Sequence, residues 1–124
     1  MSTKVTNEQL GKPPSFLSQS YIFNGMVFTS GSVGSDSEGK YSSDVVEQTH
    51  QAIKNLEEVL IASGSSLKDV MKVLLFITNR EDAAKINEVY TSYFPHKPAR
   101  SCVMVQFPNA DIKVELECVA TVSK

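Results

Sequence analysis

Apolar residues run along this chain with two different periods, and the first of them predicts β-strands. Residues 21–23 and 26–30 are apolar and aromatic segments on either side of Asn24 and Gly25, a pair typical of a tight hairpin turn. Residues 70–78 predict a strand whose run 73–77 is apolar at every position, which is typical of a strand covered on both faces. Two further predicted strands, joined by a turn at Pro108 and Asn109, are residues 101–107 and 113–122.

Apolar residues at every third or fourth position predict two helices between these strands. The first follows Ser43 and Asp44, either of which can cap it, and Gly64 ends it. The second covers residues 81–94 and ends before Pro95, because proline cannot continue a helix.

The order of elements is therefore β-β-α-β-α-β-β, an α+β arrangement in which two helices pack on one face of a sheet. We expect a single domain over residues 1–124, with irregular structure at 1–15 and 31–40. Residues 26–28 and 73–77 require cover on both faces of the sheet, which two helices on one face cannot supply. We therefore expect a homo-oligomer in which a second copy covers the other face.

Charge and hydropathy narrow the partners that this chain is suited to. With 12 basic and 14 acidic residues its net charge is −2, which argues against binding nucleic acid through a broad basic face. No apolar run approaches the roughly 20 residues that span a bilayer, so we expect no membrane insertion. Residues 1–10 lack the apolar stretch of a secretory signal. We expect a cytoplasmic protein, or a mitochondrial one if a presequence has been removed.

The cysteines and histidines give no metal-binding pattern. Cys102 and Cys118 lie in predicted strands, which favours two buried thiols over a disulfide, although the sequence alone leaves the disulfide open. Two cysteines and two separated histidines, His50 and His96, do not make a zinc pattern. We expect no metal site.

Two charged residues on the last strands are candidates for chemistry. Arg100 follows the turn at Lys97-Pro98 and shares one strand face with Cys102. Its guanidinium fork suits a substrate carboxylate, although a lone arginine is more often half of a weak surface ion pair. Glu115 lies in a charged row that ordinarily faces solvent, but beside an arginine in a partly dry cleft it can polarise a water molecule.

Four weaker candidates have neutral side chains. Ser30 and Gly31 end a predicted strand where a ligand can approach the backbone. Asn87 lies on the second helix, where a solvent-facing amide is the ordinary interpretation. Cys102 has no histidine at a recognisable spacing to act as its base, so a buried structural thiol is the better interpretation than a nucleophile.

Several segments taken in order resemble the RidA (reactive intermediate deaminase) family. The strongest are residues 87–94 and 97–103, supported by 28–31, 47–56 and 64–73. The resemblance implies a chorismate-mutase-like fold of the bacillus type, assembled as a homotrimer with clefts between subunits. It also implies hydrolysis of 2-imino acids, such as 2-iminobutanoate or 2-iminopropanoate, to 2-keto acids and ammonia without cofactor or metal.

The resemblance assigns roles to the candidate residues. Arg100 matches the residue that holds the substrate carboxylate, and Glu115 matches the one that positions the attacking water. The remaining matches are residues lining the cleft: Ser30, Gly31, Asn87 and Cys102.

The sequence also departs from the family at the cleft. Leu17 stands where a cleft tyrosine is common, and Met104 stands where many relatives carry glutamate. Loss of the hydroxyl keeps a second hypothesis open, a non-catalytic trimer that binds small acids or acts as a regulatory or chaperone-like partner. A ribonuclease or translation inhibitor is disfavoured by the acidic balance.

Overall fold

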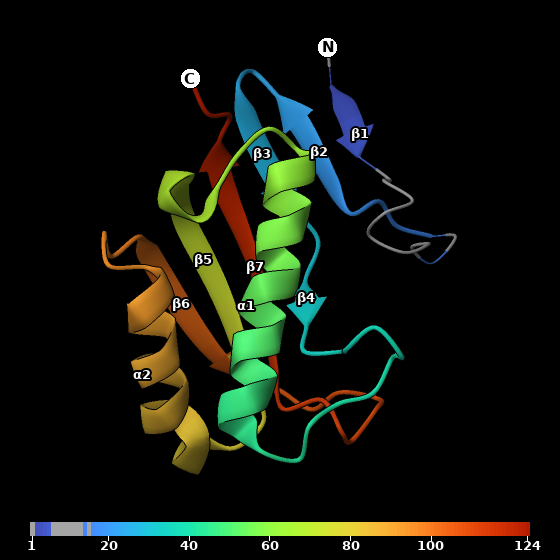
Figure 1. Cartoon of the computed structure of the whole chain (residues 1–124), viewed down its shortest axis with the longest axis vertical. Helices are drawn as coiled ribbons and strands as arrows, with labels where there is room; N and C mark the ends of the chain where they lie inside the picture. Colours follow the sequence, from blue (N-terminus) through green and yellow to red (C-terminus); the bar gives the residue numbers. More distant parts are fainter. Residues whose placement is uncertain (1, 6–13, 15) are drawn as a thin grey trace.

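The computed structural model describes residues 2–5, 14 and 16–124, in which two α-helices lie on one face of a mixed sheet (Figure 1). The helices are α1 (Val45–Ala62) and α2 (Ala83–Tyr93), and two short 3-10 turns are η2 (Leu67–Asp69) and η3 (Arg80–Asp82). The strands are β1 (Thr3–Val5), β2 (Ser20–Phe23), β3 (Met26–Thr29), β4 (Ser32–Val33), β5 (Val70–Ile77), β6 (Ala99–Met104) and β7 (Val114–Thr121). The predicted α+β architecture is confirmed.

Strand order in the described sheet is β1-β2-β3-β7-β5-β6, and β4 continues the line of β3 against β7. Among the described strands only β5 and β6 pair in parallel, because α2 carries the chain back from the end of one to the start of the other. The hairpin between β2 and β3 turns at Asn24 and Gly25, whose φ angles of 53° and 74° confirm the predicted turn.

Three predictions about the strands were wrong: two short strands were missed, and the bounds of a third were misplaced. Thr3–Val5 was expected to be irregular, but it pairs with β2 at the edge of the sheet. Ser32–Val33 was expected to be loop, but it pairs with Leu116 and Glu115. Both strands are too short to show an alternation of their own and exist through their pairing. The sixth strand begins at Ala99 and ends at Met104, earlier at each end than predicted.

The core lies between the helices and the near face of the sheet. Asp44 caps α1 by accepting a hydrogen bond from the Val46 amide at 3.0 Å. The buried face of α1 includes Ile53 and Leu56, which pack over the central strands. The strands contribute alternate residues to this core, listed here: Val27, Val73, Leu75, Ile77, Val114, Leu116, Cys118 and Ala120.

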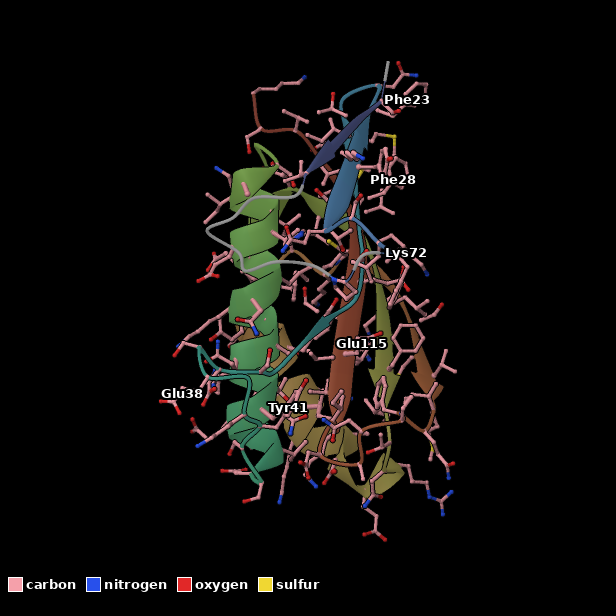
Figure 2. All side chains as sticks on the ribbon, turned by 90° about the vertical axis from the view of Figure 1, so that its right-hand side faces the viewer. Phe23, Phe28, Glu38, Tyr41, Lys72 and Glu115 are labelled. Carbon is pink, nitrogen blue, oxygen red and sulfur yellow. The ribbon has the colours of Figure 1, made fainter. Side chains whose placement is uncertain are left out.

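The far face of the sheet carries no helix in the described chain, as the side view shows (Figure 2). Phe28 is 43 % exposed there, beside Tyr21 on the neighbouring strand. Leu74 and Phe76 of β5 point to the same face and are only partly covered. Apolar side chains on this face of the described chain are therefore left partly open to solvent.

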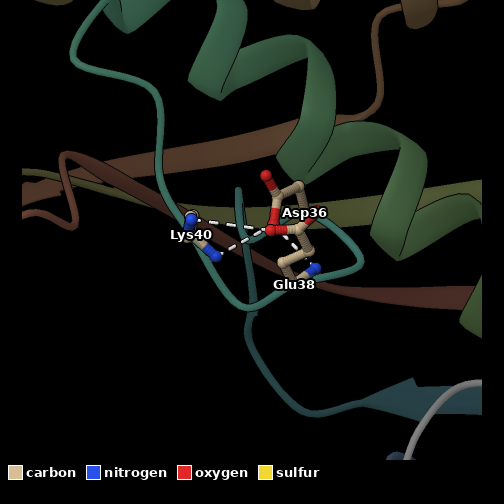
Figure 3. A network of polar contacts seen from close by, with 3 residues as sticks. All are labelled: Asp36, Glu38 and Lys40. Atoms are coloured by element: carbon tan, nitrogen blue, oxygen red, sulfur yellow. Dashed lines mark hydrogen bonds and ion pairs between the residues drawn. The ribbon is translucent and has the colours of Figure 1, made fainter.

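The loop between β4 and α1 is held in shape by one aspartate. Asp36 Oδ1 accepts hydrogen bonds from the backbone amides of Glu38 at 2.8 Å and Lys40 at 2.9 Å (Figure 3). These two bonds stabilise the carboxylate and lower the pKa of Asp36. The turn returns the chain to a bridge between Ser35 and Tyr41, which brings Tyr41 back to the edge of the sheet.

No helix among the described residues is long and apolar enough to cross a membrane.

Candidate functional site

Arg100 projects from β6 onto the helix side of the sheet, where two side chains of α2 contact it. Its Nη1 donates a hydrogen bond to Asn87 Oδ1 at 2.8 Å. Its Cζ lies 4.8 Å from the centre of the Tyr90 ring, within cation–π range. Arg100 itself is exposed, and it forms no ion pair with any of the described carboxylates.

The guanidinium of Arg100 is therefore oriented but not neutralised. Of its five N–H donors, one is directed to Asn87. The fork keeps donors for a bidentate contact with an incoming carboxylate, the anion whose geometry it matches. The ordinary interpretation as half of a surface ion pair does not hold for the described chain.

Glu115 lies on β7 beside the loop that follows β3. A Cβ atom added to Gly31 would stand 2.5 Å from both Cδ and Oε1 of Glu115, so the carboxylate rests against the bare backbone of that glycine. Glu115 is partly buried, and burial together with the nearby charge of Glu117 raises its pKa above the ordinary value. The carboxylate is thus a stronger base than an exposed glutamate.

Ser30 stands next to this carboxylate site and is fixed by the segment before β2. Its hydroxyl donates to the Ser18 carbonyl at 2.6 Å, and its amide donates to the Gln19 carbonyl at 3.0 Å. Leu17, which precedes that segment, is 38 % exposed. Leu17 comes one residue before Ser18, whose carbonyl accepts the hydrogen bond from Ser30.

The structure divides the predicted site into two groups on opposite faces of the sheet. Arg100 pairs with Val73, whose side chain is in the core beneath the helices. Glu115 pairs with Phe76, three residues further along β5 and therefore on the other face. The sequence alone left open whether the last two strands, β6 and β7, pair with each other. In the structure they do not, because β5 lies between them. One chain cannot bring Arg100 and Glu115 to the same small molecule.

The expectation of two buried thiols was wrong for one of them. Both cysteines are free; Cys118 is buried, whereas Cys102 is exposed on the edge strand β6. The edge position explains the difference, because no strand of the described chain covers the outer side of β6. Burial raises the pKa of the Cys118 thiol to about 11, which keeps that thiol protonated.

Two tyrosines near the candidate residues were not predicted as part of the site. Tyr90 is buried on α2, and its ring also contacts Arg100. Its spacing of three residues from Asn87, which places both on one side of the helix, is the signal that could have found it. Tyr41 follows the loop after β4, and its pKa is raised by burial and by the charges of Glu115 and Asp111. The described residues contain no group of three acidic, cysteine or histidine side chains placed to hold a metal ion.

Fold and site together define a small α+β protein with an oriented arginine and a partly buried carboxylate. A sequence model of the endoribonuclease L-PSP family matches residues 12–122. The chain belongs to this family, which is also called the YjgF/RidA family.

Individual relatives agree with this assignment. The chain is 41 % identical to the chloroplastic Reactive Intermediate Deaminase A of Arabidopsis thaliana over 107 residues, covering 84 % of this chain and 57 % of that longer protein. The crystal structure of yeast YEO7 superposes with a TM-score of 0.91 at 33 % identity, covering 99 % of this chain and all of the other. The structure of Escherichia coli TdcF with bound serine gives 0.79 at 36 % identity, over 86 % and 88 % of the two chains.

Proposed function

We propose that this protein hydrolyses reactive 2-imino acids, such as 2-iminobutanoate and 2-iminopropanoate, to 2-keto acids and ammonia. Family membership and a relative named as a reactive intermediate deaminase support the class of reaction. The observation that carries the proposal is Arg100, an exposed guanidinium held by Asn87 and Tyr90 with donors left for a carboxylate. Serine bound to TdcF is an amino acid of similar size and carries the same carboxylate.

In the proposed reaction Arg100 holds the substrate carboxylate and so orients the C=N bond. Glu115 takes a proton from water as the oxygen bonds to the imine carbon and the π electrons move to nitrogen. The protonated carboxyl returns that proton to nitrogen, which gives a carbinolamine. A second transfer through Glu115, from the hydroxyl to nitrogen, lets the C–N bond break and releases ammonia and the 2-keto acid.

This chemistry requires two copies of the chain, because Arg100 and Glu115 face opposite sides of the sheet. We propose a homotrimer in which the arginine side of one subunit meets the carboxylate side of the next. A head-to-tail contact between different surfaces closes into a ring when its rotation allows. The partly exposed side chains of Phe28 and Phe76 on the open face of the sheet support the same assembly. Light scattering should give about three times the chain mass of 13.6 kDa; a stable monomer would contradict both trimer and composite site.

The test of the activity is ammonia release from an imine generated in the cuvette, with and without the protein. Arg100→Ala should lower turnover by about ten- to a hundredfold, since a charge-assisted contact contributes roughly 1.5–3 kcal/mol. Arg80→Ala is the matched control, because Arg80 lies in η3 away from these residues. If folded, oligomeric Arg100→Ala protein releases ammonia like the parent, the proposed role of the arginine is wrong.

The second candidate function is a trimer that binds small acids without turning them over. The observation in its favour is Leu17, which places an aliphatic side chain where relatives often have a hydroxyl. Serine or 2-oxobutanoate binding without imine hydrolysis would decide for this candidate.

A further inference from the structure

We propose that Tyr90 is a positioning residue for Arg100, and that its ring, not its hydroxyl, holds the guanidinium in the plane needed to receive a carboxylate. The inference rests on the proposed function insofar as Arg100 is the carboxylate anchor. It assigns to a core side chain of α2 a second task, which is to fix the direction of a charged group on the neighbouring strand.

The Tyr90 ring is a rigid platform. It is 7 % exposed, and it stacks on Phe94 with ring centres 4.6 Å apart and an angle of 29°. Phe94 is itself 1 % exposed, so neither ring can swing aside without opening the core. The cation above it therefore rests on a surface that has one orientation.

Arg100 needs such a surface because, among the described residues, its guanidinium hydrogen-bonds to Asn87 alone. It is exposed on the edge strand β6, where a long side chain keeps many rotamers. Asn87 holds one edge of the guanidinium at 2.8 Å, but a single hydrogen bond leaves rotation about its own axis. The Tyr90 ring, 4.8 Å from Cζ, restrains the face of the group. Edge and face contacts together leave one plane for the guanidinium.

The hydroxyl of Tyr90 does not share this task. Tyr90 Oη is buried, and no hydrogen-bond partner for it is found among the described residues. Burial raises the pKa of the phenol, so the ring stays neutral and meets Arg100 as a π surface rather than as a phenolate. Phenylalanine offers the same surface. Tyr90→Phe should therefore preserve the position of Arg100, and Tyr90→Leu should lose it.

Nuclear magnetic resonance of the arginine side chains tests the contact without any turnover. The sequence has two arginines, Arg80 and Arg100, so Arg80→Lys assigns the remaining Nε–Hε signal. A guanidinium over a ring face is shielded by the ring current, so the Arg100 signal should lie upfield of that of Arg80. The shift should persist in Tyr90→Phe and disappear in Tyr90→Leu. An unshielded Arg100 signal in the parent protein overturns the inference without any variant.

Binding of 2-oxobutanoate, the carboxylate product, supplies the functional readout by titration of the same signal. Tyr90→Leu should weaken its binding about two- to fivefold, the equivalent of an exposed cation–π contact. Tyr90→Phe should stay within a factor of two of the parent. If Tyr90 served only to stabilise the core, affinity would fall only in variants that also lose their fold. Circular dichroism and sizing of each variant therefore accompany the titration. Folded Tyr90→Leu with parental affinity and an unchanged Arg100 signal contradicts the proposal.

Failure of this inference is distinguishable from failure of the proposed function. If the parent hydrolyses imines while Tyr90→Leu keeps its Arg100 shift and its affinity, only the positioning role falls. If the parent releases no ammonia yet shows the shielded Arg100 and the Tyr90-dependent binding, the deaminase proposal falls and the positioning role stands.

Discussion

Glu115→Gln should slow catalysis while leaving the protein as stable as the parent or slightly more so. Glutamine keeps the shape that fits against Gly31, where a single added Cβ atom would already stand 2.5 Å from the carboxylate. It removes only the negative charge, and with it the base that takes a proton from water. Loss of a positioned general base costs about 10²–10⁴ in rate.

The expected gain in stability follows from the charge next to it. Glu115 and Glu117 are two residues apart on one face of β7, which places their charges about 7 Å apart. At an effective dielectric constant of about 40–80, two like charges at this distance repel by roughly 0.6–1.2 kcal/mol. The free energy of unfolding should rise by about 0.5–1 kcal/mol at neutral pH, and the thermal midpoint by a few degrees. A purely structural glutamate would instead lose stability when neutralised.

The pH dependence gives an independent check with its own sign. The pKa of Glu115 is raised by burial and by Glu117, so its ionised form is lost at a higher pH than in an ordinary glutamate. As pH decreases, the parent's activity should therefore fall at a higher pH than the activity of an enzyme whose base is an exposed glutamate. Its stability should fall, as pH increases, through the same raised pKa, because folding favours the protonated form. Both features should vanish in Glu115→Gln.

Glu117→Gln is the matched control for this variant. It removes the second cause of the raised pKa and leaves the proposed base in place. Turnover at neutral pH should be retained, and the acid limb of the rate profile should move to lower pH. Steady-state ammonia release between pH 4 and pH 8, roughly the range in which carboxyl groups and histidine titrate, measures all three proteins. A folded Glu115→Gln protein with parental turnover would refute the reasoning.

Three other predictions concern the neighbouring residues. Gly31→Ala should displace the Glu115 carboxylate and lower turnover at least about tenfold without unfolding the chain, because the backbone there needs no left-handed angle; parental turnover would contradict the contact. Cys102→Ser should retain most activity, and loss of turnover with intact substrate binding in this variant would reopen covalent catalysis. In the parent, a thiol reagent should label exposed Cys102 before buried Cys118. Leu17→Tyr should keep the fold and change rate or substrate preference in a comparison of two imines, and an unchanged profile would show that this position does not border the cleft.

Periodicity in the sequence was sufficient to predict the layers of the fold. The helical spacing in α1 gives its buried face, including Ile53 and Leu56, and Asn24-Gly25 gives the hairpin turn. These signals are local, since each depends on residues a few positions apart. β1 and β4 were missed because they have three and two residues, and their pairing partners lie far away in the sequence.

The same distinction explains which parts of the site were predictable. Arg100 and Glu115 were identified by residue type and by resemblance, but their placement on opposite faces depends on the register of β5 between β6 and β7. A shift of one residue in either pairing would reverse a face. The exposure of Cys102 depends likewise on β6 being an edge strand, which no local pattern indicates.

The opposite-face placement of Arg100 and Glu115 has a consequence for mixtures of defective chains. In an assembly of the proposed kind, each cleft takes its arginine from one subunit and its carboxylate from the next. Chains carrying Arg100→Ala and chains carrying Glu115→Gln should each turn over substrate slowly when assembled alone. When equal amounts are unfolded and reassembled together, about one quarter of the clefts draw both intact groups, since each group is drawn independently. Two loss-of-function alleles of this protein would therefore complement each other within a single oligomer.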